Sequence, residues 1–88
     1  MKLHSQEKIY KALAHERRLE ILRLLKINKY LTVGHVAEAM NGSIQTISKH
    51  LQVLAQAHII EREKQGLEVY YAIKKPTAPI IRAILTFL

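Results

Sequence analysis

The sequence predicts a mainly α-helical domain with one small β-hairpin, in the order α-α-α-α-β-β-α. Five segments place apolar residues at helical spacing, whereas residues 59–73 alternate apolar and polar residues around a glycine. The chain has 88 residues, and 49% of them are hydrophobic, which suits a single folded domain. A domain of this size buries a modest fraction of its surface, so a partner subunit would add to its stability.

Two helices are predicted at the start of the chain. Ser5 is expected to cap the first helix, residues 5–14, because its hydroxyl can accept a hydrogen bond from the first turn. The second helix, residues 16–27, carries leucine and isoleucine on nearly every side. Such a helix is expected to be buried on two sides, at the centre of the domain.

The third and fourth helices are predicted to cross at a tight turn. Thr32 caps the third helix, and Asn41 and Gly42 end it, with Gly42 suited to a left-handed backbone. Ser43 immediately caps the fourth helix, residues 43–57. So short a connection prevents an antiparallel arrangement, and it predicts a helix-turn-helix.

The polar face of helix 43–57 has one cation, no carboxylate and several amide and hydroxyl groups. Groups that donate and accept hydrogen bonds suit contact with phosphates and base edges, whereas carboxylates are repelled by phosphates. We interpret this segment as a DNA-recognition helix; an ordinary surface helix is the alternative. The candidate DNA-binding residues on it are Ser43, Gln45, Thr46, Ser48, Lys49, His50 and Gln52. For His50, a hydrogen-bonded structural role is the alternative.

The alternating segment 59–73 predicts a hairpin with its tip at Gly66. A hairpin directly after a recognition helix is a wing, and the fold class is therefore a winged helix-turn-helix. Arg62 and Lys64 are candidate phosphate contacts; a cross-strand ion pair with Glu68 is their alternative role.

The last predicted helix, residues 78–88, carries more apolar side chains than one buried stripe requires. Surplus apolar surface is typical of an interface, so we predict a symmetric homodimer built from this helix and helix 5–14. The candidate interface residues are Ile9, Tyr10, Ile80, Ile81, Ile84, Leu85 and Leu88. A membrane-anchoring helix fits less well, because the segment is short and lacks a lysine-rich face.

Composition narrows the possible partners. The net charge of +7 favours a polyanion, either double-stranded DNA or an anionic membrane surface. The chain has no cysteine, no signal-peptide pattern and no apolar run of membrane length, so a cytoplasmic location is expected. Its five histidines are scattered, so neither a metal nor another cofactor is expected, although a histidine-based metal-responsive repressor remains an alternative. No catalytic set of residues is present, and an enzyme is not expected.

Three stretches, KALAHERRLEILRLL, VAEAMNGSIQTISKHLQVLAQAHII and QGLEVYYAI, resemble the ArsR/SmtB family of winged helix-turn-helix transcriptional repressors. The resemblance spans about Ala12 to Ile73. It implies a homodimer that binds an imperfect palindrome in DNA, with helix 43–57 in the major groove. It also implies a positive φ at His58, where the family usually has glycine. Leu67 follows the tip glycine, where relatives commonly carry a cation, which implies a weaker grip by the wing.

The sequence departs from the family pattern at its sensor positions. The metal-binding Cys-Val-Cys motif of the third helix corresponds to Thr32, Val33 and Gly34, and the last helix lacks the Asp, His and Glu ligands. The resemblance therefore implies a cysteine-free, metal-independent member. A winged-helix domain that binds proteins instead of DNA is the remaining alternative.

Overall fold

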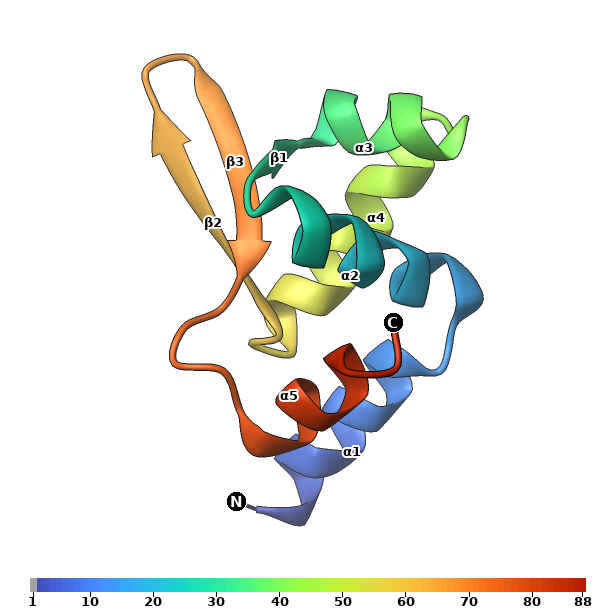
Figure 1. The fold of residues 1–88 in the computed structure, drawn as a ribbon, viewed down its shortest axis with the longest axis vertical. Helices are drawn as coiled ribbons and strands as arrows, with labels where there is room; N and C mark the ends of the chain where they lie inside the picture. The colour runs from blue at the N-terminus through green and yellow to red at the C-terminus, as the bar shows by residue number, and fades with distance from the viewer. Residues whose placement is uncertain (1) are drawn as a thin grey trace.

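The computed structural model describes residues 2–88, with five helices and three strands in this part of the chain (Figure 1). The elements are α1 (Leu3–Leu13), α2 (Glu16–Asn28), β1 (Leu31–Thr32), α3 (Val33–Met40), α4 (Ile44–Gln56), β2 (Ile60–Gln65), β3 (Glu68–Ile73) and α5 (Pro79–Leu85). The sheet flanks the helices on one side, and α1 and α5 lie together at the end opposite the hairpin tip (Figure 1). The predicted winged helix-turn-helix is confirmed.

The start of α1 differs from the prediction. Ser5 is not the cap, because the N–H of Gln6 already donates to the carbonyl of Lys2 and closes a turn before it. Lys2 is the N-cap residue and offers no side-chain hydrogen bond. At α2, His15 is the N-cap, and its side chain accepts a hydrogen bond from the N–H of Arg17.

The turn between α3 and α4 uses its two residues differently from the prediction. Asn41, with φ of 53°, takes the left-handed conformation that was expected at Gly42. Gly42 is instead required for close approach, since a Cβ atom there would lie 3.3 Å from Cγ1 and Cδ1 of Ile47. The caps are as predicted: Thr32 accepts from the N–H of His35, and Ser43 accepts from the N–H of Thr46.

The sheet has three strands in the order β1-β3-β2, so the predicted hairpin gains a strand that sequence reasoning missed. At two residues, β1 is too short to show an alternating pattern. Antiparallel pairing places Arg62 opposite Tyr71, Lys64 opposite Val69, and Gln65 opposite Glu68. The hairpin therefore turns at Gly66, which has φ of 63°.

The core joins α4 to α2 and to the base of the hairpin. Its fully buried side chains are Ile21, Leu22, Leu25, Val36, Ile47, Leu51, Leu54, Ile59 and Ile60. His58, between α4 and β2, has φ of 59°, which confirms the predicted left-handed residue. This tight connection sets the direction in which the hairpin leaves the recognition helix.

Two predicted interface residues belong to the core of the protomer. Ile9 is 7% exposed and Ile81 is 2% exposed, because α1 and α5 use these side chains to pack against the rest of the domain. They leave almost no surface for a partner. Within residues 2–88, no helix combines the length and apolar character needed to cross a membrane.

Candidate nucleic-acid interface

Helix α4 has one buried face and one exposed polar face. Ile47, Leu51 and Leu54 are each 0% exposed, and they hold the helix against the core. The opposite face has no carboxylate between Ile44 and Gln56. Its predicted site residues Gln45, Thr46, Lys49 and Gln52 are exposed, and Ser48 is half-buried. The structure thus presents these five side chains on a rigid helix.

The N-terminus of α4 is also arranged to contact an anion. The Ser43 hydroxyl accepts a hydrogen bond from the Thr46 N–H and donates one to the Thr46 Oγ1 atom, at 3.2 Å and 3.0 Å respectively. The amides that precede the first intrahelical bond point out of the helix end, where the helix dipole favours negative charge. Ser43 therefore caps the helix while its exposed end remains open to a phosphate.

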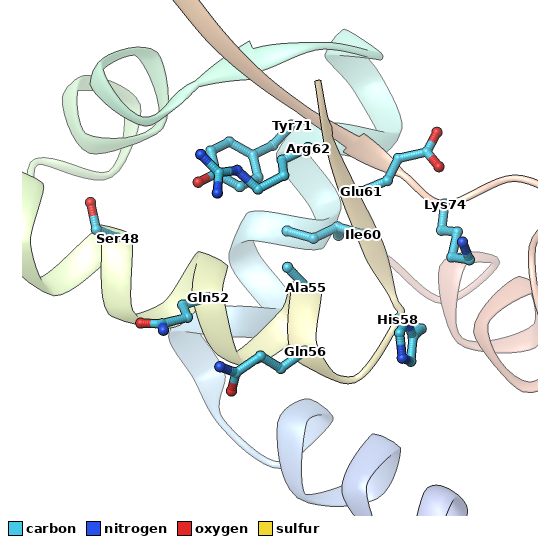
Figure 2. Close-up of a pocket in the computed structure, with 10 residues that line it drawn as sticks. All are labelled: Ser48, Gln52, Ala55, Gln56, His58, Ile60, Glu61, Arg62, Tyr71 and Lys74. Carbon is cyan, nitrogen blue, oxygen red and sulfur yellow. The ribbon is translucent and has the colours of Figure 1, made fainter. Parts of the chain in front are cut away.

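The hairpin has two faces of opposite charge, because alternate residues of a strand point to opposite sides. One face carries Arg62 and Lys64, and the other carries Glu61, Glu63 and Glu68. Figure 2 shows Arg62 beside Tyr71 on the side of α4, with Glu61 directed away from it.

The alternative ion pair with Glu68 is not formed. Within residues 2–88, the ion pairs are Lys11–Glu7 and Arg17–Glu20, and the strand register places Glu68 opposite Gln65. Both hairpin cations therefore retain their charge for an outside partner.

A groove of about 590 Å³ separates α4 from the hairpin (Figure 2). Ser48, Gln52 and Gln56 line its α4 side, and Arg62 and Tyr71 line its hairpin side. Hydroxyl, amide and guanidinium groups can all donate hydrogen bonds to anionic oxygens. The groove thus connects the exposed face of α4 with the cationic face of the hairpin.

His50 lies on the inner flank of α4, away from the other predicted contacts. Its ring centroid is 4.5 Å from that of His15, with an angle of 57° between the ring planes. Burial lowers the pKa of His50 below the ordinary 6.5, and the charges of His15, Arg18 and Arg17 lower it further. These surroundings favour a structural role at the junction of α1, α2 and α4.

This pKa shift predicts acid sensitivity. Below pH 6.5 the unfolded chain binds a proton at His50 more readily than the folded protein does, so stability is complete above this pH and falls below it. We expect NMR titration to give His50 a midpoint below 6.5. His15→Asn, which keeps a capping side chain, should raise that midpoint and reduce the loss of stability in acid. An unchanged midpoint in His15→Asn would contradict the role of the ring pair.

Arg17 is a positioning residue that sequence reasoning missed. Its Nη2 atom donates to the carbonyl of Met40 at 3.2 Å, and its Nη1 atom donates to Glu20 at 3.2 Å. The guanidinium thus ties α2 to the turn that precedes α4. Because Arg17 and Met40 are 23 residues apart, no local pattern reveals this contact.

The histidines remain dispersed in the folded chain. Among residues 2–88, no three His, Asp or Glu side chains come together where they could hold a metal ion. The ring pair of His15 and His50 is the one close approach of two histidine rings in this part of the chain, and the cap bond of His15 uses one ring nitrogen.

Comparison with known proteins agrees with this geometry. A family model described as a helix-turn-helix domain matches residues 13–63. The transcriptional repressor PagR of Bacillus anthracis is 33% identical over 76 residues, which cover 86% of this chain and 76% of PagR. The transcriptional repressor SdpR of Bacillus subtilis (strain 168) is 38% identical over 65 residues, which cover 74% of this chain and 71% of SdpR.

Solved structures show the same architecture. The crystal structure of PagR has a TM-score of 0.82 and 29% identity, with 97% of this chain and 93% of that chain covered. The NMR structure of a homodimeric winged helix-turn-helix domain from Mycobacterium bovis, a possible ArsR-family regulator, also has a TM-score of 0.82 and 29% identity. That comparison covers 97% of this chain and 75% of the other.

Proposed function

The chain belongs to the ArsR family of winged helix-turn-helix DNA-binding transcriptional regulators, and we propose that it represses transcription by binding an imperfect palindrome as a homodimer. The observation that carries the proposal is the continuous surface formed by the carboxylate-free face of α4 and the cationic face of the hairpin. Two similar proteins, PagR and SdpR, are transcriptional repressors, which supports the direction of regulation.

In this proposal, α4 enters the major groove. An α-helix with its side chains is about 10–12 Å across, and the groove is about 12 Å wide. Gln45 and Gln52 would pair with base edges, because an amide can bind adenine through two hydrogen bonds. Lys49 would contact guanine or a phosphate, and Ser43 and Thr46 would receive a phosphate at the helix N-terminus.

The groove between α4 and the hairpin would hold the sugar-phosphate strand that borders the major groove. Arg62 and Lys64 on the hairpin would contact its phosphates from one side, and Ser48 would contact them from α4. The acidic face of the hairpin points away from this strand. The charge segregation of the hairpin therefore supports one orientation of the wing on DNA.

The dimer would form through the terminal helices, residues 5–14 and 78–88. A cleft of about 320 Å³ between α1 and α5 is lined by Gln6, Ile9, Tyr10, Pro79 and Ile80. Tyr10 is 52% exposed and Phe87 is 86% exposed, which leaves an apolar surface beside this cleft. The other predicted contacts, Ile80, Ile84, Leu85 and Leu88, are half-buried, so they retain surface for a partner.

Tyr10→Glu should shift the protein from dimer to monomer, because a carboxylate would replace an aromatic side chain at the apolar surface. Sedimentation velocity at micromolar concentration measures this shift. Lys8→Glu changes the charge of another exposed residue of α1 to the same carboxylate, and it should leave the dimer intact. A monomeric wild type, or equal dimers of Tyr10→Glu and wild type, would contradict the proposed interface.

Selection of genomic DNA fragments bound by the purified protein tests the proposed function directly. We expect a two-fold symmetric site with half-sites about 34 Å apart, one helical turn. Gln45→Ala should relax the preference at one base pair of each half-site, at about 1–3 kcal/mol per contact, while non-specific binding persists. Failure to select any sequence, together with salt-independent binding, would contradict DNA recognition and favour the protein-binding alternative.

A further inference from the structure

The tip of the hairpin carries an apolar side chain that the fold does not use. Leu67 is 100% exposed. It follows Gly66 in a two-residue loop between the paired residues Gln65 and Glu68. Only Gly66 of the two has positive φ, the pattern of a type II′ turn, which matches the twist of the strands. A short turn of this kind holds Leu67 at the end of an ordered hairpin.

The tip lies where the hairpin would meet DNA beyond the major groove. In Figure 1, the tip and the α3–α4 turn point to the same end of the molecule. Six residues of strand span about 20 Å, which is more than the width of the major groove, about 12 Å. With α4 in that groove, the tip therefore passes the sugar-phosphate strand and reaches the adjoining minor groove.

The charges of the hairpin limit how deeply it can enter. Arg62 and Lys64 suit one phosphate strand, but Glu63 and Glu68 on the opposite face would meet the second strand of the minor groove. That groove is only about 6 Å wide, so repulsion keeps the paired strands outside it. Only the loop of Gly66 and Leu67 can enter.

We propose that Leu67 is an apolar minor-groove contact that makes the operator sensitive to the deformability of the base step beneath the wing tip. The inference rests on the proposed function and adds a specificity determinant to it. A leucine side chain has no hydrogen-bonding group, so it reads neither base edges nor phosphates; it contacts deoxyribose carbons and wedges against a base step. Pyrimidine-purine steps such as TA unstack most easily, and they are the steps it favours.

The test compares duplexes that carry the selected half-sites with either TA or the stiffer AA at the step under the wing tip. Leu67→Ala should weaken binding to the TA duplex roughly three- to tenfold, by loss of apolar contact, and should remove most of the difference between the duplexes. Leu67→Met keeps an apolar side chain of similar length and should retain the preference. A 2-aminopurine at the step should brighten with wild type and Leu67→Met, but not with Leu67→Ala.

Ile27→Ala is the matched control, because Ile27 is another largely exposed aliphatic residue, on a helix outside the proposed interface. It should bind both duplexes as wild type does. Equal step preference and equal 2-aminopurine signal in wild type and Leu67→Ala would overturn the inference while sequence-specific binding remained. Loss of all sequence preference in wild type itself would overturn the proposed function together with it.

Discussion

Lys49→Ala is expected to lower operator affinity at least about tenfold, the effect of losing one charged contact of about 1–3 kcal/mol. Lys49 is exposed on α4 and is the only cation between Ile44 and Gln56. In a dimer the substitution removes two such contacts. If both are to phosphates of B-DNA, the slope of log K against log salt should fall by about 2. Fluorescence anisotropy between 50 and 200 mM salt measures both quantities.

Lys75→Ala separates a local contact from the general charge of the protein. Lys75 is exposed in the connection between β3 and α5, at the end of the hairpin opposite its tip, and its loss changes the net charge equally. We expect a small loss of affinity without a change in sequence preference. Equal effects of Lys49→Ala and Lys75→Ala would contradict the assignment of α4 as the recognition helix.

Leu51→Ala is expected to lower the free energy of unfolding by about 2–5 kcal/mol, because it leaves a cavity where the core cannot fully collapse. Leu51 is 0% exposed and belongs to the same buried cluster as Leu22 and Ile60. A domain of this kind is stable by only about 5–15 kcal/mol, so this single change removes a large fraction of its stability. Urea denaturation followed by circular dichroism, at one fixed protein concentration, measures the loss.

The neighbouring residue provides the control. Gln52 is exposed on the opposite side of α4, so Gln52→Ala should change stability by no more than about 0.5 kcal/mol. Gln52→Ala should nevertheless weaken DNA binding, whereas Leu51→Ala acts through folding. Comparable losses of stability in the two variants would mean that α4 does not pack as described.

Sequence reasoning predicted most of the fold because its signals were local. The caps at Thr32 and Ser43 act on amides three residues away, and the apolar stripe of α4 repeats within a single helix. The position expected to be left-handed, His58, is fixed by the short connection between α4 and the hairpin. The errors lay at element ends: Ser5 is not a cap, and Asn41 takes the backbone conformation expected of Gly42.

The sequence by itself determined the order of the elements, the recognition face of α4 and the charge of the hairpin residues. Tertiary structure alone decided which distant groups meet. It placed His50 against His15, bonded Arg17 to Met40, and moved Ile9 and Ile81 into the core. Periodicity reports which face of a helix is apolar, but the partner of that face depends on how the whole chain packs. For the same reason, only the fold showed that the cations of the hairpin face α4 across a groove.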